Sequence, residues 1–418
     1  MGKYLIRGGK PLTGEVRISG AKNAALPVLA AAVATKGENI IEACPEISDV
    51  DNMISILEAL GCRIARYGTS IMINASELTE CRIPDELMKE MRSSVFLAGS
   101  LLARCGEAVI SSPGGCNIGK RPIDIHIKGL KSLGAEIEYS GDKIYIKSGN
   151  MKGAYIRLDY PSVGATENLM LAATAEEGIT VIDNSASEPE INALQDYINR
   201  CGGRVSGAGT GRITICGRRK LTGCEYRMIP DRIEAGTFLL MCAGTEGDVC
   251  LKGVVADHIR PLIEIVRAGG SRIYTWDDNL RICSTAAGRV KCSVDTAPYP
   301  GFPTDLQSQL TAFLTVKGED CIVRENIFEN RFRYAKQLIK MGADIEISQK
   351  EVIIKGNNIL YGCDVEAEDL RGGAALVIAG LMAEGDTVLN NTKYIKRGYS
   401  RFREKIQKLG GEIREDGQ

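Results

Sequence analysis

The sequence has few of the side chains that build a metal centre. Its 418 residues include only two histidines, His126 and His258, and no two of its fourteen cysteines lie within four residues of each other. Zinc sites in proteins usually draw their ligands from closely spaced Cys and His residues. We therefore expect no metal, and no sequence pattern indicates a cofactor.

Net charge and long apolar runs are also scarce. The 52 basic and 53 acidic residues nearly cancel, and aromatic residues make up only 5% of the chain, so a nucleic-acid partner is not expected. The best apolar run, residues 24–34, contains Pro27 and is too short to cross a bilayer, so no membrane partner is expected either. The chain opens on a strand-like pattern without a signal peptide, which predicts a cytoplasmic protein with reduced thiols.

A repeated pattern organises the chain. An amphipathic helix, a glycine-containing turn and two short alternating strands follow one another six times. The turn dipeptides are Leu60-Gly61, Leu133-Gly134, Cys201-Gly202, Ala268-Gly269, Met341-Gly342 and Leu409-Gly410. These glycines suit helix C-termini that need a positive φ. The first three lie 208 residues before the last three, so the chain contains two copies of a three-repeat unit.

Each repeat has the order strand, helix, strand, helix, strand, strand over about 70 residues. One sheet and two helices can share a core at that size, so three repeats predict one closed domain and six predict two. An open solenoid is the alternative, but solenoid repeats are usually about 20–45 residues long. We therefore predict an α/β protein (α+β in some classifications) of two similar domains, with a ligand cleft between them.

The densest chemical signal is the segment from Pro113 to His126, in which Cys116 lies among glycines and beside Lys120 and Arg121. The positive charges favour the thiolate form of Cys116. The segment is not a nucleotide P-loop, because Arg121 stands where Ser or Thr would hold magnesium. Cys116 is either a reactive thiol or one of many small buried hydrophobic residues, and the pattern alone leaves both open.

Two further residues are expected at helix starts. Lys22, followed by Asn23, lies between a strand and an alanine-rich helix, where it would suit an anion or simply be solvated. Asp305 follows a stiff loop containing Pro300 and Pro303, and it is either a functional carboxylate or a helix N-cap.

Several arginines stand near predicted helix starts or turns. Each alone is more often a surface charge, but together they predict a site for a polyanionic ligand, because guanidinium groups pair well with phosphate and carboxylate. They are Arg92, Arg232, Arg331, Arg371 and Arg397.

Taken together, these segments resemble the UDP-N-acetylglucosamine 1-carboxyvinyltransferase family over nearly the whole chain. The matching segments are residues 19–24, 91–92, 113–126, 162–166, 188–190, 230–234, 302–307, 328–332 and 369–371. The resemblance implies an enolpyruvyl transferase fold, an inside-out α/β barrel in each domain. It also implies domain boundaries at 22–229 and at 1–21 plus 230–418, with the active site in the cleft.

The resemblance also implies a reaction and roles for residues. The enolpyruvyl group of phosphoenolpyruvate passes to the 3-hydroxyl of UDP-N-acetylglucosamine with release of phosphate, the first committed step of peptidoglycan precursor synthesis. Cys116 would protonate the methylene carbon of phosphoenolpyruvate, and it can also form a covalent adduct with it. Asp305 would accept the proton of the sugar hydroxyl.

The remaining roles are in binding. Lys22, Arg121 and Arg397 would hold phosphate and carboxylate, with Asn23 nearby. The other substrate-binding residues are Arg92, Pro122, Ile123, Asp124, Ile125, Ser162, Val163, Gly164, Ile327, Asp369 and Arg371.

The chain departs from the family pattern at two positions. Tyr160 lies near Ser162, where some members carry a lysine, and Lys396 precedes Arg397, where an acidic residue is common. The sister enzyme that uses shikimate 3-phosphate is one alternative, but it lacks the Cys116 loop. A catalytically silent regulator that binds a sugar nucleotide is the other, and intact Lys22, Cys116, Asp305 and Arg397 argue against it.

Overall fold

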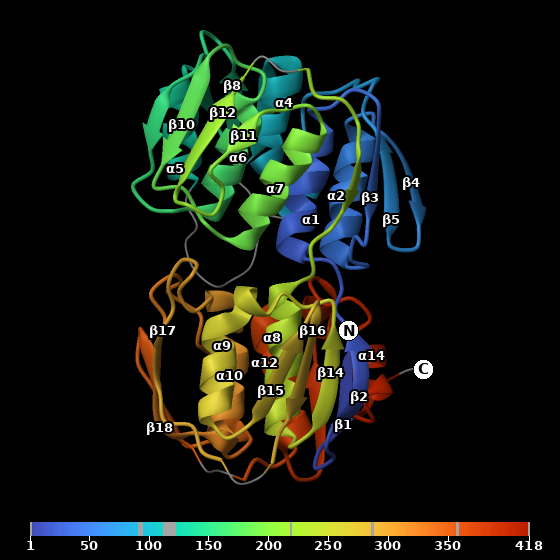
Figure 1. The fold of residues 1–418 in the computed structure, drawn as a ribbon, viewed down its shortest axis with the longest axis vertical. Coiled ribbons are helices and arrows are strands. Elements are labelled where there is room, and N and C mark those ends of the chain that lie inside the picture. The colour runs from blue at the N-terminus through green and yellow to red at the C-terminus, as the bar shows by residue number, and fades with distance from the viewer. Residues whose placement is uncertain are drawn as a thin grey trace. The chain divides into compact units, whose positions relative to one another are not determined.

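The computed structural model describes residues 2–90, 95–111, 123–217, 220–285, 288–356 and 359–416. These residues form two compact units (Figure 1). The continuous unit comprises the described residues from Gly20 to Ile229. The discontinuous unit comprises residues 2–19 together with the described residues from Pro230 onward.

The continuous unit contains α-helices and three sheets. Its helices are α1 (Lys22–Ala32), α2 (Ser48–Ala59), α3 (Asp85–Glu90), α4 (Leu97–Cys105), α5 (Asp124–Leu133), α6 (Val163–Ala173) and α7 (Pro189–Arg200). Its strands are β3 (Glu38–Glu42), β4 (Arg63–Tyr67), β5 (Ser70–Asn74), β6 (Glu107–Ser111), β7 (Glu136–Ser140), β8 (Lys143–Lys147), β9 (Tyr155–Arg157), β10 (Ile179–Asp183), β11 (Val205–Ser206), β12 (Arg212–Cys216) and β13 (Glu225–Arg227). The strand orders are β13-β3-β5-β4, β6-β8-β7 and β11-β12-β10-β9.

The discontinuous unit has the same kind of organisation. Its helices are α8 (Arg232–Gly244), the 3₁₀ helix η2 (Ala256–Ile259), α9 (Arg260–Ala268), α10 (Thr304–Lys317), α11 (Arg333–Lys340), α12 (Leu370–Met382), α13 (Lys393–Lys396) and α14 (Phe402–Lys408). Its strands are β1 (Lys3–Arg7), β2 (Thr13–Arg17), β14 (Asp248–Lys252), β15 (Arg272–Trp276), β16 (Asn279–Cys283), β17 (Ser293–Asp295), β18 (Glu319–Arg324), β19 (Ile345–Ile347), β20 (Glu351–Gly356), β21 (Asp364–Glu366), β22 (Asp386–Asn390) and β23 (Glu412–Glu415). The strand orders are β15-β16-β14-β2, β17-β18-β20-β19 and β21-β22-β1-β23.

In both units some helices are buried on all sides and the sheets lie outside them. Residues 165–173 of α6 and 371–381 of α12 are all buried, which is the expected position for a helix that is apolar around its circumference. The strands alternate, so that one face packs inward; in β5, Ile71 and Ile73 are fully buried. We call α1, α4, α6, α8, α10 and α12 the inner helices. The predicted α/β class is confirmed, and the described strands form separate sheets, none of which closes on itself.

The strands β1 and β2 complete sheets whose other strands lie more than 200 residues later in the sequence. β1 lies between β22 and β23 and is antiparallel to both, with Ile6 opposite Thr387 and Ile413. β2 runs parallel to β14, so the blue strands in Figure 1 lie beside yellow and red ones. In the continuous unit, the strand parallel to β3 is β13, from the other end of that unit. Consequently the first and last repeats are not built from consecutive residues alone.

The glycine turns agree with the prediction except at one position. The φ angles of Gly61, Gly134, Gly202, Gly342 and Gly410 are +99°, +103°, +91°, +100° and +86°. The prediction for Gly269 was wrong: this residue is the C-cap of α9 with a φ of −76°, and Gly270 has a φ of +86° instead. The reason is the Gly269-Gly270 pair, whose second glycine adopts the left-handed conformation one residue later.

Three further observations bear on the expectations from composition. None of the described helices is long and apolar enough to cross a membrane. The described residues contain no cluster of three or more His, Cys, Asp or Glu side chains that could hold a metal ion. Every cysteine in the described segments is a free thiol.

Candidate active site

Four of the predicted site residues lie at the N-termini of inner helices, two in each unit. Lys22 is the first residue of α1, Ser162 caps α6, Asp305 is the second residue of α10, and Asp369 caps α12. Backbone N–H groups at a helix N-terminus are unpaired and carry partial positive charge. These positions therefore suit anionic substrates, and a carboxylate placed there is stabilised.

Asp305 is held between two buried arginines. Its Oδ1 accepts a hydrogen bond from Arg331 Nη2 at 2.8 Å, and its Oδ2 accepts one from Arg371 Nη2 at 2.9 Å. The arginine side chains are 3% and 4% exposed, whereas that of Asp305 is 26% exposed. The alternative that Asp305 is a helix cap was wrong, because Pro303 occupies the N-cap position. The two charge-assisted hydrogen bonds fix the carboxylate and leave part of it accessible.

The arginines retain further buried donors. Among the described residues, Arg331 Nε and Arg371 Nη1 are buried and have no hydrogen-bond partner. Buried polar groups are normally satisfied, so these nitrogens indicate a ligand-binding position. Although burial lowers the pKa of Arg371, its neighbours Asp305, Tyr399 and Asp231 together raise it above the usual value.

Arg371 is supported by Tyr399, which follows α13, and by residues of the inner helices α8, α10 and α12. The guanidinium of Arg371 lies over the ring of Tyr399, with 5.5 Å between Cζ and the ring centroid. The Tyr399 hydroxyl accepts a hydrogen bond from Gln309 Nε2 at 3.0 Å and lies 2.9 Å from Thr237 Oγ1. Asp369 Oδ1 accepts from the backbone N–H groups of Arg371 and Gly372, so it caps the helix that carries Arg371.

Lys22 is not a solvated surface lysine, so that alternative was wrong. It is 9% exposed, and its Nζ lies 2.7 Å from Asp49 Oδ2. The first turn of α1 contains no acidic residue, so Asp49 of α2 supplies the counter-charge. Sequence reasoning missed Asp49; its only signal was a position in the first turn of an amphipathic helix. Asn23, beside Lys22, is partly buried.

The start of α6 is shaped by close packing. Ser162 Oγ accepts a hydrogen bond from Ala165 N at 3.3 Å. A Cβ at Gly164 would lie 2.8 Å from a ring carbon of Phe96, which explains why a larger residue does not fit. Nearby, His126 Nδ1 lies 3.1 Å from Asn168 Nδ2, and Asn168 Oδ1 accepts from Gly99 N, which links α4, α5 and α6. Val163 is partly buried.

With this geometry described, similarity to known proteins can be assessed. The sequence model of the family described as EPSP synthase (3-phosphoshikimate 1-carboxyvinyltransferase) matches residues 6–406. UDP-N-acetylglucosamine 1-carboxyvinyltransferase 2 of Caldanaerobacter subterraneus subsp. tengcongensis is 48% identical over 413 residues, covering 99% of each chain. UDP-N-acetylglucosamine 1-carboxyvinyltransferase of Halothermothrix orenii is 45% identical over 415 residues, again covering 99% of each.

The chain belongs to the UDP-N-acetylglucosamine 1-carboxyvinyltransferase family. Solved structures agree on the fold of this family member. The enolpyruvyl transferase NikO from Streptomyces tendae superposes with a TM-score of 0.90 at 23% identity, with 99% of each chain covered. EPSP synthase from Acinetobacter baumannii gives 0.77 at 19% identity, with full coverage of both chains.

Four of the residues predicted for this family lie outside the described residues: Arg92, Cys116, Arg121 and Pro122. The neighbouring residues Ile123 and Ile125 are partly buried against the core, and Asp124 is exposed at the start of α5. Asp124 lines a surface hollow of about 510 Å³ together with Lys128 of α5 and Tyr139 of β7.

The remaining predicted residues lie in the discontinuous unit. Arg397 is partly buried at the end of α13. Its neighbour Lys396 forms an ion pair with Glu415, with 2.7 Å between Nζ and Oε1. Ile327 is partly buried in the loop after β18, and Arg232 begins α8 with its guanidinium 5.9 Å from the Tyr299 ring centroid.

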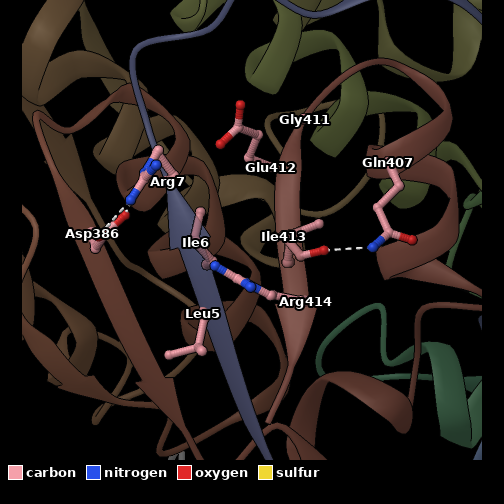
Figure 2. A pocket seen from close by; sticks show the side chains of 9 residues that line it. All are labelled: Leu5, Ile6, Arg7, Asp386, Gln407, Gly411, Glu412, Ile413 and Arg414. Carbon is pink, nitrogen blue, oxygen red and sulfur yellow. Dashed lines mark hydrogen bonds and ion pairs between the residues drawn. The ribbon is translucent and has the colours of Figure 1, made fainter. Parts of the chain in front are cut away.

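Another hollow, of about 350 Å³, lies on the sheet that contains β1 (Figure 2). Arg7 forms two hydrogen bonds with Asp386 there, and Gln407 Nε2 donates to the carbonyl of Ile413 at 2.6 Å. None of the residues that line it belongs to the predicted site. The hollow therefore does not alter the assignment of the candidate site.

Proposed function

We propose that this chain transfers the enolpyruvyl group of phosphoenolpyruvate to the 3-hydroxyl of UDP-N-acetylglucosamine and releases phosphate. The observation that carries the choice of acceptor is the 48% identity over 99% of each chain to a relative named for that sugar nucleotide. The reaction is the first committed step of peptidoglycan precursor synthesis. We place it in the cytoplasm, a reducing compartment in which the free thiols of the described residues would be stable.

The proposed reaction has two stages. First, the Cys116 thiol gives its proton to the methylene carbon of phosphoenolpyruvate while the sugar 3-hydroxyl oxygen attacks the neighbouring carbon. Asp305 takes the hydroxyl proton, and a tetrahedral intermediate forms. Second, the Cys116 thiolate takes a proton back from the new methyl group as the phosphate leaves, so that an enol ether remains and the thiol is restored.

The surroundings of Asp305 support its role as the proton acceptor. Its carboxylate is fixed by Arg331 and Arg371 at the first turn of α10, yet it is 26% exposed and thus accessible to a substrate. A base held in place in this way does not have to reorganise during the reaction.

The surroundings of the positive groups support the binding of phosphate and carboxylate. Lys22 is buried beside Asp49, and the buried nitrogens Arg331 Nε and Arg371 Nη1 remain available for hydrogen bonds among the described residues. We propose that Lys22, Arg121, Arg371 and Arg397 hold the anionic groups. The nucleotide sugar would be held by Arg92, the segment 121–125, Ser162 to Gly164 and Ile327. Asn23 and Asp369 would bind substrate beside the cations Lys22 and Arg371.

Release of phosphate from phosphoenolpyruvate tests this proposal. We expect release with UDP-N-acetylglucosamine and none with shikimate 3-phosphate. Cys116→Ala should abolish it, whereas Cys105→Ala, at an exposed cysteine, should retain it. Release with shikimate 3-phosphate alone would move the chain to the sister activity, and release with neither acceptor would indicate a silent sugar-nucleotide-binding protein.

A further inference from the structure

Glu325 is a buried carboxylate with no predicted role. It directly follows β18, is 3% exposed, and accepts four hydrogen bonds. Its Oε1 accepts from Thr296 Oγ1 at 3.0 Å and from the backbone N–H groups of Ile327 at 2.8 Å and Phe328 at 3.0 Å. Its Oε2 accepts from Thr304 Oγ1 at 2.8 Å.

These donors belong to separate segments. Thr296 follows β17, Thr304 begins α10, and Ile327 and Phe328 lie in the loop that follows Glu325 itself. Two further hydrogen bonds join the end of β17 to the end of β18: Asn326 N donates to Thr296 Oγ1 at 2.9 Å, and Thr296 N donates to the carbonyl of Arg324 at 2.9 Å. A single carboxylate thus ties a strand end, a helix start and a loop together.

Each carboxylate oxygen of Glu325 is connected to Asp305 through an intermediate residue. Through Oε2 it fixes Thr304, the residue before Asp305 in the first turn of α10. Through Oε1 it fixes the backbone of Phe328, whose ring lies 5.5 Å from Arg331 Cζ, and Arg331 bonds to Asp305. The same oxygen holds Ile327, a residue proposed to contact the nucleotide sugar.

Within the described residues, Glu325 forms no ion pair; hydroxyl and amide donors satisfy it instead. Such bonds are directional, so they set positions more than they supply charge. We propose that Glu325 is a positioning residue for the proposed transfer. It holds the head of α10, with Asp305, at a fixed distance from the Ile327 loop, so that the acceptor hydroxyl meets its base. This inference rests on the proposed function.

The test measures kcat and KM for both substrates in the parent protein and in Glu325→Ala and Glu325→Gln. In Glu325→Ala, kcat/KM for UDP-N-acetylglucosamine should fall by about 100-fold, since displacement by roughly 1 Å can have that effect. KM for phosphoenolpyruvate should change less than KM for UDP-N-acetylglucosamine, because its proposed ligand Arg371 is linked to Glu325 only indirectly, through Asp305. Glu325→Gln should recover to within about tenfold of the parent, because an amide oxygen still accepts from Ile327 and Phe328 and its NH₂ group can donate to Thr304.

A matched control lies at the other end of the same helix. Glu246 pairs with Lys317, the last residue of α10, with 2.5 Å between Oε1 and Nζ. Lys317 is about 20 Å along the helix from Thr304. Glu246→Gln should therefore lower stability without changing kcat or KM by more than about twofold.

Three outcomes would overturn the inference. The first is that folded Glu325→Ala has the kcat and KM of the parent. The second is that Glu325→Gln and Glu325→Ala lose kcat/KM equally. If Glu325→Ala does not fold, Thr304→Val decides, because it removes only the bond to Oε2; unchanged kcat/KM there would refute the inference, and a loss of about tenfold would support it. No release by the parent protein would instead refute the proposed function itself, and the inference with it.

Discussion

Both units bury a glutamate in an inner helix, but they surround it with charges of opposite sign. In the discontinuous unit, Glu234 of α8 is 2% exposed, and its carboxylate forms an ion pair with Lys405, which also donates to Ser19 Oγ at 2.6 Å. In the continuous unit, Glu167 of α6 is 1% exposed, and the charged groups that act on it are Glu190 and Glu188.

The two environments act differently on the pKa of the buried glutamate. Burial raises the pKa of Glu234, but Lys405 opposes that shift. Burial raises the pKa of Glu167 well above its ordinary value, and the two neighbouring glutamates raise it further. One unit therefore compensates a buried carboxylate with a cation, and the other favours its protonated form. The units should respond differently when charge or pH is changed.

The largest expected effect is at Asp305, where the discontinuous unit pairs one carboxylate with two buried arginines. Asp305→Asn should lower the free energy of unfolding by about 3–5 kcal/mol, because it removes the charged carboxylate that both buried guanidinium groups contact. Phosphate release should fall at least about 100-fold. Urea unfolding and the phosphate assay measure the two effects. Asp386→Asn, which breaks the exposed pair with Arg7, should leave activity unchanged. If Asp386→Asn and Asp305→Asn lost equal amounts of stability and phosphate release, the role assigned to burial would be contradicted.

The ion pair between Glu234 of α8 and Lys405 of α14 gives the next largest effect. Lys405→Met should lower the free energy of unfolding by about 3 kcal/mol at pH 7, because Glu234 remains buried without its cation. Without Lys405 the pKa of Glu234 stands higher, so its proton is bound more tightly in the folded state, and the deficit should shrink as pH falls toward 5. The double variant Lys405→Met with Glu234→Gln should recover most of the loss. A deficit that is independent of pH would show that Lys405 acts through packing.

Replacing Glu167 should have a smaller effect. The stability of this variant relative to the parent should rise with pH, whereas that of Lys405→Met should fall. Because its pKa is raised in the folded state, its favourable contribution is complete below the ordinary value of 4.5 and is lost as pH rises toward the folded pKa. Glu167→Gln should remove this dependence, which is at most about 1.4 kcal/mol per pH unit for one proton. Urea unfolding of parent and variant at pH 5 and pH 8 measures it. The variant should gain stability relative to the parent at pH 8, and a constant difference would refute the assignment.

The smallest effect is expected at Lys396, whose side chain is 53% exposed beside Glu415. Lys396→Gln should change the free energy of unfolding by less than about 1 kcal/mol, because solvent screens an exposed pair. Activity should stay at the parent level. A marked loss of phosphate release would mean that this departure from the family pattern affects Arg397 directly.

Local patterns predicted much of the fold. The glycine turns after the helices set the six repeats, because a left-handed residue at a helix end has a recognisable sequence cause. The pairing of β1, β2 and β13 with strands far away in the sequence does not follow from local pattern. Alternation along Lys3–Arg7 predicts a strand, but it does not reveal that Ile6 pairs with Thr387, which is 381 residues away.

The candidate site divides in the same way. The proline-rich loop predicted a helix start near Asp305, and α10 does begin at Thr304. Arg331 was predicted to bind an anion, but its observed anionic partner is Asp305, because folding brings together residues 26 positions apart. Asp49 and Glu325 were missed, since a single acidic residue outside a motif gives no local signal of its partner.

The place of β1 and β2 also constrains the order of folding during synthesis. Residues 2–19 are made before the rest of the discontinuous unit, yet β2 pairs with β14, and β1 pairs with β22 and β23. The continuous unit has all its described strands once residue 229 has been made. β2 can pair once β14 has been made, but β1 must wait with both backbone edges unpaired until β22 and β23 have been made, so β1 is the strand exposed longest to aggregation and chaperones.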